Sequence, residues 1–171
     1  ATEAEGDACE RRMASLVRWH LACLAIQIAC LGLDRAASEI VLSFGLMIRL
    51  GLVVPLYAAG AFLIVRGPRS LRLPAILLPL VAATGAVAFL GVLALPPFSD
   101  RYTMAAGMIP LLGVILMPMT FREAALLTSF ALPVYAGVAT AHWGIGHPEP
   151  VLDLVVFMSA LVCLGLLARH R

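Results

Sequence analysis

The chain has few charged residues and no lysine, since all twelve of its basic residues are arginines. Charged residues make up 13% of the chain, whereas about a quarter is usual for a soluble domain. Hydrophobic residues reach 62%, and the mean hydropathy is +1.00. A water-soluble core cannot hide that much apolar surface, so we expect the protein to work within or across a lipid bilayer. Its arginines lie in short clusters rather than on one basic face, which argues against a nucleic-acid partner.

The connections between apolar runs also lack the motifs of catalysis. They contain no nucleophile with a base, no glycine-rich phosphate loop and no clustered carboxylates. The cysteines show no C-x-x-C or metal-type spacing, so we expect them to act as small packing residues. They are Cys9, Cys23, Cys30 and Cys163. We therefore expect no enzyme activity in this segment.

Two further features are missing. No internal repeat relates the two halves, which disfavours a transporter built from inverted repeats. The acidic residues 1–10, Arg11 and Arg12 precede the first apolar run without a small-residue cleavage pattern. We expect this run to be retained as a membrane span.

Apolar runs long enough to cross about 30 Å of hydrocarbon recur along the chain. In lipid the backbone must satisfy its own hydrogen bonds, so each run is predicted to be a helix. Short polar links make consecutive helices antiparallel. The sequence predicts an all-α membrane protein, a bundle of six transmembrane helices, with residues 1–12 as a cytoplasmic N-terminal segment and 169–171 beginning a cytoplasmic connector. The predicted spans are 13–33, 40–65, 73–95, 102–119, 124–142 and 151–168.

The distribution of arginines predicts the orientation, because cytoplasmic flanks carry the excess of positive charge. In the six-span arrangement nine arginines lie on one side: Arg11, Arg12, Arg18, Arg66, Arg69, Arg72, Arg122, Arg169 and Arg171. Only Arg35 and Arg101 lie on the other side. Both termini are therefore predicted to be cytoplasmic, and removing or adding one crossing would scatter the arginines over both sides.

Arg49 lies about ten positions inside the second predicted span, where a charge is costly unless it is paired or hydrated. We expect its side chain to face the bundle interior. The candidate partners are Asp153, Gln27, Tyr135 and Thr140. Arg49 either pairs with Asp153, fixing the second helix against the sixth, or holds a carboxylate or phosphate ligand that enters from the outer side.

The four histidines raise the alternative of a b-type haem or another metal, since haem in membrane bundles is held by histidines from facing helices. His20 and His170 are both expected near the inner side, where they could meet. His142 and His147 flank the link between the fifth and sixth spans and could form an outer site with Glu149. Single histidines at helix ends also serve as interfacial anchors, which is the competing interpretation.

Aromatic and proline residues have simpler interpretations. Three aromatic residues fall near predicted interfaces and match an aromatic belt: Trp19, Tyr102 and Trp143. Four prolines lie inside predicted spans, where proline frees a backbone carbonyl and can kink the helix: Pro55, Pro79, Pro110 and Pro133.

Three stretches resemble a known family of membrane domains. They are the run MIRLGLVVPL at 47–56, the segment 102–124 with its basic turn, and the segment 155–169. Together they resemble the six-span, MASE-like sensory modules that precede GGDEF diguanylate cyclases and class III adenylate cyclases in bacteria. Asp153 departs from the amide or apolar residue expected at its position, which favours an ion pair with Arg49.

The resemblance implies a sensory input domain in the bacterial inner membrane. It would act as a homodimer and control a C-terminally fused cytoplasmic cyclase, which would begin after Arg171, through a ligand- or redox-dependent rearrangement. Arg49 and Asp153 would form the latch, with Gln27 and Tyr135 beside it. The alternatives are a haem-binding, cytochrome b-like protein and a small transporter or channel subunit.

Overall fold

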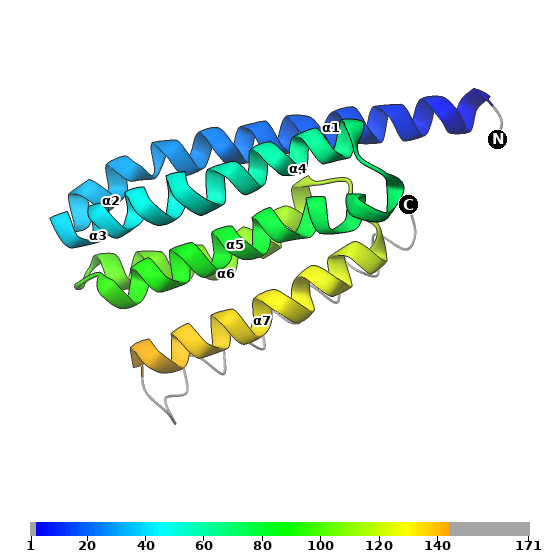
Figure 1. Cartoon of the computed structure of the whole chain (residues 1–171). Coiled ribbons are helices and arrows are strands. Elements are labelled where there is room, and N and C mark those ends of the chain that lie inside the picture. The colour runs from blue at the N-terminus through cyan, green and yellow to red at the C-terminus, as the bar shows by residue number, and fades with distance from the viewer. Residues whose placement is uncertain (1–2, 144–171) are drawn as a thin grey trace.

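The computed structural model describes residues 3–143, and this part of the chain consists of helices joined by short turns (Figure 1). The expectation of an all-helical fold is thus confirmed for these residues. The elements are α1 (Glu3–Ala29), α2 (Leu31–Ala37), α3 (Glu39–Gly45), the π-helical segment η1 (Leu46–Val53), α4 (Val54–Arg66), the 3₁₀ turn η2 (Arg69–Leu71), α5 (Arg72–Leu93), α6 (Phe98–Leu116) and α7 (Phe121–Trp143).

These elements form five long rods that lie side by side (Figure 1). The first two rods are composite: α2 continues α1, and α3, η1 and α4 run on without interruption. The five rods overlap the predicted spans from 13–33 to 124–142, while the predicted span 151–168 lies outside the described residues. Part of the predicted N-terminal segment is also helical, because α1 begins at Glu3 and extends past the other helices at its N-terminal end (Figure 1).

Three helical runs in the described part of the chain are long and apolar enough to cross a membrane: Asp7–Ala37, Glu39–Arg66 and Arg69–Leu93. Many large apolar side chains on the rods face outward, among them Met47, Phe62 and Met104. In water such a surface would mark an interaction site or drive aggregation, whereas lipid accommodates it. These features support a membrane protein.

Helix α5 occupies the centre of the described bundle. Within the apolar stretch of the run Arg69–Leu93, 61% of the residues are buried. The corresponding share in the run Asp7–Ala37, which contains most of α1, is 17%. Helix α5 packs against α4, α6 and α7, and Leu80 of α5 shares one apolar cluster with Leu127 of α7. The central position explains why α5 is apolar around its whole circumference rather than along one stripe.

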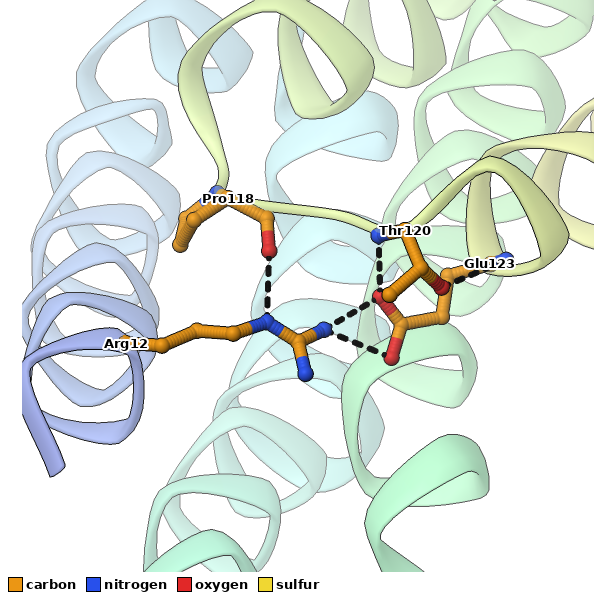
Figure 2. A network of polar contacts seen from close by, with 4 residues as sticks. All are labelled: Arg12, Pro118, Thr120 and Glu123. Carbon is orange, nitrogen blue, oxygen red and sulfur yellow. Dashed lines mark hydrogen bonds and ion pairs between the residues drawn. The ribbon is translucent and has the colours of Figure 1, made fainter. Parts of the chain in front are cut away.

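A polar clamp joins α1 to the turn between α6 and α7 (Figure 2). Arg12 donates from Nη2 to both carboxylate oxygens of Glu123, at 2.9 and 2.6 Å, and from Nε to the Pro118 carbonyl at 2.9 Å. Glu123 also accepts from the Thr120 backbone N–H at 2.6 Å, and the Thr120 hydroxyl accepts from the Glu123 N–H at 3.3 Å. This reciprocal pair is a capping box, and it orients the carboxylate that Arg12 binds.

The clamp predicts a difference between two neighbouring arginines. Replacing Arg12→Gln should lower the free energy of unfolding by about 1 kcal/mol, because a partly exposed ion pair and a bond to a carbonyl are lost. The exposed Arg11 serves as the control, and Arg11→Gln should change stability by less than about 0.5 kcal/mol. Thermal unfolding of the detergent-purified protein measures both, and equal effects would contradict the assignment.

Candidate functional site

Arg49 and Asp34 form a buried ion pair near the end of the bundle where α2 meets α3. The Arg49 Nε donates to Asp34 Oδ2 at 2.7 Å, and Nη2 donates to Oδ1 at 3.1 Å. Both side chains are removed from the surface, with 1% of Arg49 and none of Asp34 exposed. Such two-pronged contacts between guanidinium and carboxylate are among the strongest side-chain interactions, and here they neutralise two charges that apolar surroundings would penalise.

Two more buried side chains complete this centre. Gln27 of α1 accepts a hydrogen bond from Arg49 Nη1 at 2.5 Å, and the Tyr102 hydroxyl of α6 donates to Asp34 Oδ1 at 2.5 Å. Asp34 therefore accepts three hydrogen bonds, and Arg49 donates three. We call Gln27, Asp34, Arg49 and Tyr102 the buried polar network. It ties together α1, α2, η1 and α6.

The π-helical winding of η1 places Arg49 on the buried face. Buried residues follow one another at intervals of four: Val41, Gly45, Arg49, Val53 and Tyr57. An α-helix has 3.6 residues per turn, so residues spaced four apart would turn gradually away from one face of the helix. The π-helical segment η1 has more residues per turn, which brings these residues back to the buried face. Val54 donates to the Arg49 carbonyl five residues earlier, and Pro55, which has no N–H to donate, follows directly.

Gly45 provides the space that Asp34 occupies. A Cβ atom at residue 45 would lie 2.9 Å from Asp34 Cγ and closer still to Oδ2. The carboxylate thus rests against the bare backbone of α3, one turn before Arg49 on the same rod. A side chain here would push Asp34 away from its hydrogen-bond partners.

The sequence identified Arg49 and Gln27 as members of the site but missed Asp34 and Tyr102. Asp34 stands in the short polar link after the first predicted span and was not among the candidate partners of Arg49. Tyr102 was interpreted as part of an interfacial aromatic belt, whereas the structure buries both side chains. Arg49 lies ten residues, or roughly 15 Å, from the start of its rod, whereas Asp34 lies close to the end of the preceding rod. Counting residues along the two helices therefore places the two backbones at different levels of the bundle. The long arginine side chain closes that gap. No acidic residue follows Arg49 closely in the sequence, so its partner had to be sought earlier in the chain. This was the one signal that could have indicated Asp34.

The other candidate partners of Arg49 lie elsewhere or outside the described residues. Tyr135 is buried on α7, with its ring against Gly107 of α6. The Thr140 hydroxyl donates to the Ala136 carbonyl of its own helix. Asp153 lies outside the described residues, so its pairing with Arg49 stays a prediction.

His20 is fully buried between α1, α4 and α5. Its Nδ1 lies 2.8 Å from the Leu16 carbonyl and Nε2 lies 3.1 Å from the Ala75 carbonyl, while its ring meets Tyr57 edge to face. Each nitrogen thus lies within hydrogen-bond distance of a backbone carbonyl, and a neutral ring donates to one of the two. The role of His20 as a haem ligand stays a prediction. Across the described residues, no group of three His, Cys, Asp or Glu side chains could hold a metal ion.

The remaining histidines cannot be placed in a site. The structure describes the backbone of His142 but not its side chain, and His147 and His170 lie outside the described residues.

An apolar cavity of about 130 Å³ borders the buried polar network. It lies among α1, α4, α5 and α6, and its walls include Trp19, Cys23, Tyr57 and Ile109. Gln27 belongs both to the wall of this cavity and to the network. A small apolar molecule in the cavity would therefore touch a direct partner of Arg49.

No known protein family, curated protein or solved structure matches the chain.

Two glycines of the second rod provide a test of the site geometry. Gly45→Ala should displace Asp34 and lower the free energy of unfolding by about 1–3 kcal/mol, because buried polar atoms lose their partners. Gly51→Ala is the matched control, since a Cβ there meets nothing within 4 Å, and its stability should be unchanged or slightly higher. Thermal unfolding in detergent compares the two, and a harmless Gly45→Ala would show that Asp34 does not need this space.

Proposed function

We propose that this chain is a membrane-embedded sensory domain that controls a cytoplasmic nucleotide cyclase, either a diguanylate or an adenylate cyclase. The buried polar network carries the proposal. Ionised side chains inside a membrane are costly, and where they occur they usually belong to a functional site. This network joins four helical elements through one carboxylate and one guanidinium. Its Arg49 lies in a π-helical segment, a feature often found at functional sites.

Such a network suits a two-state switch. When any one partner moves away, a charge or a polar group loses its hydrogen bonds in an apolar environment, so intermediate arrangements are disfavoured. A ligand can then shift the balance only if it binds the two arrangements with different affinity. The cavity beside Gln27 is a place where a small apolar ligand would exert such a preference.

The proposed topology is a six-helix bundle in the bacterial inner membrane with both termini in the cytoplasm. At the end of the described bundle where α1 begins and α4 ends lie seven arginines: Arg11, Arg12, Arg18, Arg66, Arg69, Arg72 and Arg122. Arg35 and Arg101 lie at the opposite end. This asymmetry supports a cytoplasmic N-terminus.

The cyclase, the homodimer and the sixth span come from the resemblance to MASE-like modules. In this scheme the proposed sixth span, 151–168, leads from the bundle toward the effector, and a rearrangement of the buried polar network changes how two such spans pair. The gene offers the first test. We expect its reading frame to continue past Arg171 into a cyclase domain, and a different effector or none would refute this part of the proposal.

The functional test separates switching from mere stability. In the protein with its cytoplasmic domain, Asp34→Asn and Arg49→Gln each leave a buried group without its partner and should cost about 3–5 kcal/mol of stability. The double replacement Asp34→Leu with Arg49→Met removes both charges at similar volume. It should recover part of that stability, since no charge stays unpaired, although Gln27 and Tyr102 still lose their partners.

We expect the double variant to change the basal cyclase rate by about fivefold or more and to abolish any response to stimulus, because the switch is gone while the fold remains. Cyclic nucleotide production in membranes and thermal unfolding are measured on the same preparations. A stable double variant with a normal rate and a normal response would show that the ion pair is structural only.

A further inference from the structure

A second site lies at the opposite end of the bundle from the buried polar network. An open groove of about 1030 Å³ runs between the N-terminal half of α1 and the junction of α4 with α5. We call it the arginine groove, because Arg18, Arg69 and Arg72 all line it.

Among the described residues that line the groove, basic side chains outnumber acidic ones. Glu10 is the one acidic side chain among the residues that line it, against three guanidinium groups. Within the described part of the chain, the Nε of Arg72 is buried and has no hydrogen-bond partner. This atom is closed to solvent as it lies, so an anion in the groove would bind the Arg72 guanidinium through its charge and its outer N–H groups rather than through Nε.

The start of α5 adds to this preference. The helix begins at Arg72, and its N-cap residue Leu71 has no side chain that could accept a hydrogen bond from the first turn. The partial positive charge of the helix N-terminus therefore reinforces the three arginines.

The rest of the groove is apolar, with Val17 of α1 facing Ile64 and Val65 of α4. A groove with a cationic end and an apolar wall matches a molecule with an anionic head and a hydrocarbon tail. A soluble phosphate compound would use only the cationic end of the groove and make no contact with the apolar wall. The same end of the bundle carries most of the arginines, as expected for the rim of a membrane.

The geometry points to the arginine groove as a binding site for an anionic phospholipid, whose phosphate contacts Arg69 and Arg72 and whose acyl chain lies along Val17 and the exposed Val65. The net charge of such a lipid distinguishes it from phosphatidylcholine, whose quaternary ammonium group the arginines would repel. This site does not depend on the sensory role, since it shares no residue with the buried polar network.

The test is a titration of the detergent-purified chain followed by native mass spectrometry. We expect phosphatidylglycerol to bind at least tenfold more tightly than phosphatidylcholine, and soluble glycerol phosphate not to compete. The variant with both Arg69→Gln and Arg72→Gln should bind phosphatidylglycerol roughly thirtyfold more weakly, since each arginine near a lipid surface contributes about 1 kcal/mol.

Arg101→Gln is the matched control, because Arg101 lies at the other end of the bundle, over the ring of Phe98. It should leave the affinity unchanged within about twofold. If the double variant fails to fold, the exposed Arg18 decides the matter, and Arg18→Gln should weaken binding about fivefold. Equal binding of the two lipids, competition by glycerol phosphate, or the same loss with Arg101→Gln would each overturn the proposal.

Discussion

The cost of placing a charge in apolar surroundings governs this structure. Arg49 and Asp34 are both buried, and each is tolerable only because the other is present. Around them the fold supplies Gln27 and Tyr102 as further partners, the π-helical winding that aims Arg49, and the open backbone at Gly45. These features come from separate stretches of the chain. One electrostatic requirement therefore fixes how four helical elements meet at this end of the bundle.

Polar contacts at the two ends give the bundle its register, because apolar contacts between helices are non-directional. The buried polar network joins α1, α2, η1 and α6 at one end, and the clamp of Arg12 with Glu123 joins α1 to α7 at the other. Between them α5 is held by apolar packing on several sides. Helix α1 is thus anchored at both ends by hydrogen bonds. The proposed sensory switch belongs to the first end and the proposed lipid site to the second, so a bound lipid would steady α1 where the switch does not reach.

The sequence and the structure agree on properties that depend only on the order of residues along the chain. Five predicted spans overlap the five described rods, because a long apolar run in lipid has little choice but to satisfy its backbone as a helix. Burial of Arg49 followed from its position alone. The identity of its main partner did not, since Asp34 stands beside Arg35 and Ser38 in a cluster typical of an exposed link. Tyr102 was also misjudged, because a tyrosine near a span end usually lies at the interface. Here its ring packs in an apolar cluster with Val41 and Leu90, and its hydroxyl bonds to Asp34.

By itself the sequence determined that the described chain is helical, which segments form the rods, and which arginines gather at each end, because hydropathy and backbone hydrogen bonding act along the chain. The tertiary structure alone decided that Asp34 reaches Arg49, that His20 lies between two backbone carbonyls, and that Arg12 meets Glu123. Most of these contacts join residues from different helices, and they depend on the reach of long side chains, a widened helical turn and the room beside a glycine. None of these is encoded in the apolar pattern, since they arise only when the helices pack together.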